Sequence, residues 1–122
     1  LLGPAHLVAH RVPSLLAAAD VNVLTSDSEG CPNTIIEALG VGTPIVSGDV
    51  GDVGFMCGEG ASGSVVPVDD DDAYVRACLD WLARGEEGRA AVRARWPALE
   101  EAYGMDSMVR RTLELWREVV SL

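Results

Sequence analysis

The sequence predicts an α/β domain with a parallel sheet and a helical C-terminal tail. Short apolar, β-rich runs alternate with helix-like segments along the first part of the chain, which is typical of a parallel sheet. Nearer the C-terminus, apolar residues recur at helical spacing. With 122 residues, 48% of them hydrophobic, the chain is long enough for a single domain over residues 1–122 and too short for two.

The first half of the expected sheet follows in chain order. The apolar run Leu7–Ala9 is the first expected strand, and a short helix begins at Pro13. The run Val21–Leu24 suits a buried parallel strand. After a loop we expect a helix over Asn33–Val41, stopped near Gly42, because the left-handed turn that ends a helix is cheap for glycine.

The second half of the expected sheet is interrupted by a long loop. The strand Thr43–Ser47 comes first. The glycine-rich stretch Asp49–Gly63 follows as a loop, with one helical turn at Val53–Cys57. Ser64–Pro67 is then a short strand closed by proline, which cannot donate to a sheet.

Three helices are expected in the tail. The first follows the acidic cluster Asp69–Asp72, and its apolar stripe is Tyr74, Ala77, Cys78, Trp81 and Leu82. That cluster lacks the glycine and distal glutamate of a calcium loop, so we interpret it as capping the helix N-terminus. Gly85 breaks the pattern, and a second helix over Glu86–Ala102 is interrupted or bent at Pro97.

The third tail helix is expected over Met105–Leu122 and carries a broad apolar stripe. At this spacing, methionines and a tryptophan are typical of core packing rather than of cofactor contacts. The stripe, which we expect to be buried, is Met105, Met108, Val109, Thr112, Leu113, Trp116, Val119 and Val120.

Composition excludes several classes of function. The net charge is −10 and all nine basic residues are arginine, which argues against a nucleic-acid partner. No apolar run approaches a membrane span and no signal peptide is recognisable, so a cytoplasmic protein is expected. Cys31, Cys57 and Cys78 have no zinc-site spacing, and we expect them to be reduced. His6 and His10 lack a nearby third ligand, so no metal site is expected.

Two glutamates eight residues apart form the strongest candidate site. Glu29 lies in the loop after strand Val21–Leu24, and Glu37 lies about one turn into the next helix. Ligands of open parallel sheets bind outside the carboxyl ends of the strands. Free amides at the helix start, here Asn33, Thr34 and Ile35, favour a phosphate group. The spacing alone would equally fit two glutamates without a binding role, Glu29 as an ordinary loop acid and Glu37 as a surface residue of the helix.

The surrounding motif resembles a known donor-site signature. Ser26-x-x-Glu29-Gly30-x-Pro32-x(4)-Glu37-Ala38-x(3)-Gly42-x-Pro44-Ile45-Val46 is similar to that of the retaining GT-B glycosyltransferases of family 4 (glycosyl transferases group 1). The segments Val12–Asp20 and Gly63–Pro67 resemble further parts of that family. The resemblance covers nearly the whole chain. It implies a Rossmann-like, three-layer, C-terminal donor-binding domain.

The resemblance also implies roles for individual residues. The donor would be a nucleotide diphosphate sugar, used with retention and without a metal or other cofactor. Glu29 would be catalytic and contact the transferred sugar, and Glu37 would bind the ribose hydroxyls. The backbone around Gly30, Cys31, Asn33 and Thr34 would face the sugar and the diphosphate.

The sequence also departs from the family. The N-terminal acceptor domain and the basic pair that holds the diphosphate are missing, so we expect the isolated chain to be inactive. An incomplete sheet would favour self-association. Asp52 stands where a small or amide residue is commoner, and Cys31 replaces an apolar one. A non-catalytic nucleotide-sugar-binding or interaction module and another GT-B enzyme, such as a phosphorylase-like one, remain alternatives. Peripheral membrane association stays open.

Overall fold

A computed structural model describes residues 11–121, and its centre is a three-stranded parallel sheet in the order β1-β2-β3. The strands are β1 (Asn22–Leu24), β2 (Ile45–Gly48) and β3 (Gly63–Val66). Val23 lies opposite Val46, and Val46 lies opposite Ser64. The parallel α/β prediction is therefore confirmed for three strands, with ends shifted by one or two residues. The expected strand Leu7–Ala9 lies outside the described residues.

One face of the sheet is covered by three short helices, which share one core cluster with the side chain of Ile45. They are α1 (Val12–Ala18), α2 (Asn33–Gly40) and α3 (Val53–Cys57). The predicted turn at Val53–Cys57 is confirmed residue for residue. The buried members of this core cluster include Leu16, Ile35, Leu39, Ile45, Val53, Met56 and Cys57.

The opposite face is covered by the first part of α4 (Asp71–Tyr103). Trp81 packs there with Val46 and Val66, and its Nε1 donates a hydrogen bond to Ser64 Oγ at 2.9 Å. Because side chains of a strand alternate between faces, Val46 and its neighbour Ile45 enter different clusters. The predicted apolar stripe is thus largely confirmed, although Leu82 is 50% exposed.

Two sequence-based interpretations of α4 are confirmed, one at its N-terminus and one near its middle. The Asp70 carboxylate accepts a hydrogen bond from the Ala73 amide at 2.8 Å, so the acidic cluster does cap the helix. Gly85 has φ +50° and ψ −128°, which breaks the helix into two parts. Glycine reaches this conformation without the steric cost of a side chain. Pro97 lies inside the second part.

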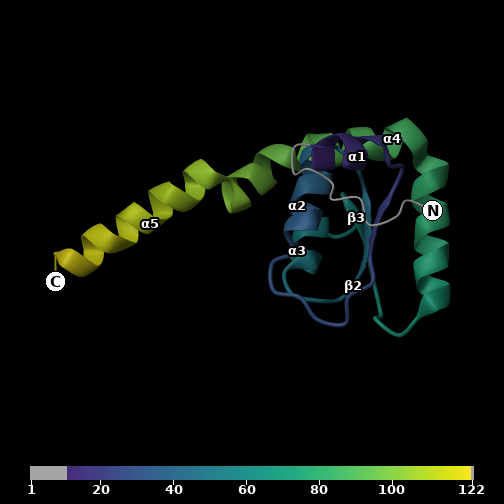
Figure 1. The fold of residues 1–122 in the computed structure, drawn as a ribbon, viewed down its shortest axis with the longest axis horizontal. Helices are drawn as coiled ribbons and strands as arrows, with labels where there is room; N and C mark the ends of the chain where they lie inside the picture. The colour runs from purple at the N-terminus through teal and green to yellow at the C-terminus, as the bar shows by residue number, and fades with distance from the viewer. Residues whose placement is uncertain (1–10, 122) are drawn as a thin grey trace.

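The break at Gly85 lets the second part of α4 return over the helices on the first face (Figure 1). There Val92 and Leu99 join the core cluster of α2 and α3. Arg89 donates to the carbonyls of Ala17 and Ala19, at 2.9 and 2.7 Å, at the end of α1. The result is three layers, with helices on both sides of the sheet.

Helix α5 (Met105–Val120) projects from the body as a separate arm (Figure 1). The helix itself was predicted correctly, but the expected burial of its apolar stripe is wrong. Trp116 is 62% exposed and Val120 is 85% exposed. Helical periodicity identifies an apolar face but not the element that covers it, and no described element packs along this face. The expected self-association through the sheet edge stays a prediction.

Within residues 11–121, every helix is too short or too polar to cross a membrane.

Candidate functional site

The candidate site is built where two loops meet at the carboxyl end of the sheet. One loop leaves β1 after Leu24, and the other leaves β2 after Gly48. The Asp52 amide donates to the Gly30 carbonyl at 2.9 Å, which joins the loops. A Cβ atom on Gly51 would lie 1.9 Å from the carbonyl oxygen of Gly30, and Gly51 has φ +50°. Only glycine at position 51 allows this close approach.

The carboxylate of Glu29 is held by a neighbouring side chain. Ser26 Oγ donates a hydrogen bond to Glu29 Oε1 at 2.7 Å, and the glutamate is half-buried. A charge-assisted bond of this length orients the carboxylate, and its second oxygen has no donor among residues 11–121. The motif contained Ser26 but assigned it no role. Its spacing three residues before the glutamate was the available signal.

The N-terminus of α2 follows this loop directly. Pro32 is the N-cap in an extended conformation, with φ −71° and ψ 112°, and its side chain makes no capping hydrogen bond. Asn33 and Thr34 are exposed, and their amides have no acceptor among residues 11–121. The Ile35 amide was also expected to be free, but it donates to the Pro32 carbonyl at 3.1 Å, because a tight first turn uses it.

Glu37 lies one turn further along α2 and is exposed. The predicted residues Glu29, Gly30, Cys31, Asn33, Thr34 and Glu37 therefore occupy one continuous loop-to-helix segment at the carboxyl end of the sheet. The structure brings them to the edge at which parallel sheets bind ligands. Their roles stay predictions.

Cys31 lies at this edge near an acidic residue of the second loop. Desolvation and then the negative charge of Asp52 raise the pKa of the Cys31 thiol. The thiol therefore stays protonated at neutral pH and is a poor nucleophile, since the thiolate is the reactive form. Cys31 therefore offers the candidate site no reactive thiolate, and the role expected for its backbone stays a prediction.

Tyr74 also contacts this edge of the sheet, which its helical spacing did not predict. Its hydroxyl donates to the Leu24 carbonyl at 3.2 Å, at the last residue of β1. The phenol passes over Gly48, where a Cβ atom would lie 2.8 Å from the Tyr74 oxygen. Helix α4 thereby fixes the point at which the Glu29 loop begins.

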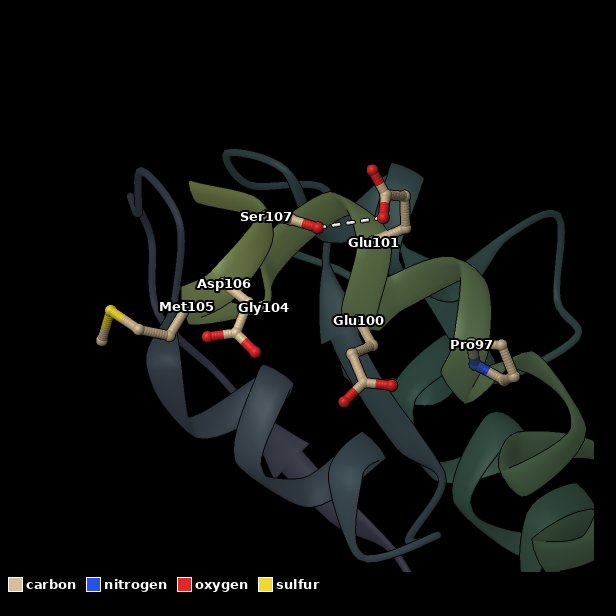
Figure 2. A pocket seen from close by; sticks show the side chains of 7 residues that line it. All are labelled: Pro97, Glu100, Glu101, Gly104, Met105, Asp106 and Ser107. Carbon is tan, nitrogen blue, oxygen red and sulfur yellow. Dashed lines mark hydrogen bonds between the residues drawn. The ribbon is translucent and has the colours of Figure 1, made fainter. Parts of the chain in front are cut away.

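A groove of about 440 Å³ lies elsewhere, at the junction of α4 and α5 (Figure 2). Glu101 is the centre of its polar contacts, since it accepts from Ser107 Oγ at 2.9 Å and from Arg110. Hydrogen bonds from Arg110 and then Ser107 lower the pKa of Glu101. These contacts join the last turns of α4 to the first turns of α5. The groove is lined by Pro97, Glu100, Glu101, Gly104, Met105, Asp106 and Ser107, none of them a predicted site residue.

Comparison with known proteins identifies a family and several relatives. Residues 2–84 match the family described as "Glycosyl transferases group 1". The chain is 36% identical over 109 residues to a "2-deoxystreptamine N-acetyl-D-glucosaminyltransferase" of Streptomyces fradiae, covering 89% of this chain and 26% of the relative. It is 33% identical over 130 residues to a "D-inositol 3-phosphate glycosyltransferase" of Paenarthrobacter aurescens, covering 98% of this chain and 31% of the relative.

The chain thus spans less than a third of the length of these two relatives. The family match covers the sheet, both site loops and α2, and it ends within the first part of α4. On this match the chain belongs to the group 1 glycosyl transferases.

Proposed function

We propose that the segment Glu29–Glu37 is the donor half of a glycosyltransferase site. The enzyme would move a sugar from a nucleotide diphosphate sugar to an acceptor, with retention, in a GT-B fold. The observation that supports this most is that one short segment holds the Glu29 carboxylate, which accepts from Ser26, and the Asn33 and Thr34 amides, which have no acceptor among residues 11–121. Oriented acceptors for hydroxyls and donors for phosphates then lie in one segment.

The chemistry of the two carboxylates suits a sugar nucleotide. A carboxylate can accept from two adjacent hydroxyls, and each bond to a charged group contributes about 1.5–3 kcal/mol. We assign the ribose hydroxyls to Glu37 and the transferred sugar to Glu29. The Asn33 and Thr34 amides would stabilise the charge that develops on the leaving diphosphate.

We also propose which groups outside these residues complete the half-site. The chain has no lysine, so a lysine that holds the diphosphate would have to come from outside these 122 residues. We propose that an acceptor-binding domain completes the site and that no metal or cofactor takes part. The two relatives described above are named for 2-deoxystreptamine and for D-inositol 3-phosphate, and we propose a small acceptor of this kind.

Replacement of Glu37 by alanine tests the ribose contact. We expect one of the nucleotides UDP, GDP and ADP, or the glucose or mannose conjugate of that nucleotide, to shift the amide resonances of residues 30–37 in an NMR titration. The Glu37→Ala change should weaken this binding about tenfold, since it removes charge-assisted bonds. Glu87, an exposed glutamate of α4, provides the control variant Glu87→Ala, which should bind like the parent chain.

A nucleotide titration without shifts would contradict the proposed half-site. If every nucleotide leaves the resonances of the folded chain unchanged, the half-site does not bind alone and the proposal fails for this segment. Donor binding without sugar transfer, once an acceptor domain is supplied, would favour a non-catalytic nucleotide-sugar-binding module.

Ser26→Ala tests the orientation of Glu29. We expect the variant to bind the nucleoside diphosphate as before but to lose the extra affinity of the sugar conjugate, by about threefold to tenfold, because only the sugar contacts Glu29. The measurement is a pair of titrations, with and without the sugar. Ser28→Ala serves as control, since Ser28 is exposed. An equal loss for both ligands would contradict the positioning role.

A further inference from the structure

Helix α5 leaves an apolar face uncovered within residues 11–121. Eight of the fifteen large hydrophobic residues that are exposed in this part of the chain lie on α5. Even Leu113, the least exposed of the eight, is 42% exposed. Two grooves, of about 390 and 330 Å³, lie along this helix and share Leu113 and Arg117. A continuous apolar face of this kind is typical of a surface that another surface covers.

The charge of α5 differs from that of the rest of the chain. The helix carries three arginines and three acidic residues, so it is neutral, and the net charge of −10 lies entirely outside it. Two copies of so acidic a body repel each other. Because the arm projects away from the body (Figure 1), a second copy meets the least repulsion along α5.

Asp106 and Arg117 make this face complementary to itself. They lie eleven residues apart, which is close to three helical turns, and therefore on the same side of α5. Both line the groove of about 330 Å³, whose apolar residues are Val109 and Leu113. Neither forms an ion pair within residues 11–121. The groove thus has an acid near one end and an arginine near the other.

A second α5 in antiparallel orientation matches this pattern. A two-fold axis near the middle of the helix places each Asp106 beside the partner's Arg117. A parallel pair would instead bring like charges together at both ends, which is unfavourable. In the antiparallel pair Met108 meets the partner's Trp116, since these residues lie at about equal distances from the axis. Methionine and aromatic residues are enriched in the cores of protein interfaces.

We propose that α5 is a self-association surface on which two copies of the chain pair in an antiparallel, two-fold symmetric way. The inference goes beyond the donor site and does not depend on it. One helix pair is smaller than a standard protein interface, so we expect a dissociation constant of about 100 μM. At about 10 μM the chain is then largely monomeric, and unfolding measured there reports on the exposed arm.

Sedimentation velocity of the 122-residue chain, from about 10 to about 500 μM, tests this pairing. We expect the sedimentation coefficient to rise with concentration toward that of a dimer. Trp116→Ala should weaken the association about tenfold, because large aromatic contacts dominate interface energies. Leu79→Ala is the matched control, since Leu79 is 60% exposed but lies on α4, and it should leave the association unchanged.

The variants Asp106→Arg and Arg117→Asp test the charge pairs. Each variant puts like charges together at both ends of the dimer and should weaken the association about tenfold. An equimolar mixture of the two variants should restore it, because the mixed pair again joins opposite charges. Asp80→Arg, at an exposed aspartate of α4, changes the net charge as Asp106→Arg does and should not weaken the association. Circular dichroism checks that every variant is folded.

Three results would overturn the inference: a chain that stays monomeric at about 500 μM, a dimer that survives Trp116→Ala, or a mixture of the charge variants that associates no better than either alone. A monomer would leave the apolar face of α5 to a different partner, and a dimer indifferent to all α5 variants would point to the sheet edge. The donor proposal is tested separately, because nucleotide shifts are followed on residues 30–37.

Discussion

Trp81→Ala is expected to lower the free energy of unfolding by about 3–5 kcal/mol. Trp81 is 2% exposed and fills the space between α4 and the sheet, beside Val46 and Val66. Its removal leaves a cavity and also leaves the Ser64 hydroxyl without the Nε1 donor. Urea denaturation followed by circular dichroism measures the loss.

Trp116→Ala is the matched control. Trp116 is 62% exposed on α5, so its loss should change the free energy of unfolding by no more than about 0.5 kcal/mol. If Trp116→Ala were as costly as Trp81→Ala, the apolar stripe of α5 would be packed in solution. That result would contradict the exposed arm of Figure 1.

Gly51→Ala is expected to be the most damaging small change at the candidate site. An added Cβ would lie 1.9 Å from the Gly30 carbonyl oxygen, and residue 51 has φ +50°. The two loops must then separate, which breaks the bond from the Asp52 amide to Gly30. We expect a loss of about 2 kcal/mol in stability and of most nucleotide binding. Thermal unfolding and the nucleotide titration measure both.

Gly54→Ala provides the comparison for this change. Gly54 lies in α3, and a Cβ atom there would meet nothing within 4 Å. Because alanine favours a helix by about 0.5–1 kcal/mol over glycine, this variant should be as stable as the parent or slightly more so. Unchanged nucleotide binding in Gly51→Ala would show that the contact of the two loops is not needed for the site.

Most of the secondary structure could be predicted because its signals are local. The β-rich run ending at Leu24 and the apolar spacing around Trp81 depend on neighbours within a few residues. Gly85 was recognisable as a break, and Asp70 as part of a capping cluster, for the same reason. The strand ends shifted by one or two residues, since hydrogen bonding to the next strand decides where a strand stops.

The candidate site could be located from sequence but not assembled from it. The spacing of Glu29 and Glu37 placed both on one loop and one helix, because that distance is short along the chain. The hydrogen bond of Asp52 to Gly30 and that of Tyr74 to Leu24 join segments that are far apart in sequence. No local pattern encodes such pairs, so the contact between the two loops could not be predicted.

Local sequence signals were enough to predict which elements form, which residues carry the donor motif and which family the chain resembles. The tertiary structure decided what each apolar face meets. The stripes of α4 and α5 have the same helical period, yet Trp81 is buried and Trp116 is exposed. The reason is that periodicity is set by the geometry of one helix, whereas burial requires a second surface, and the described chain supplies that surface for Trp81 alone.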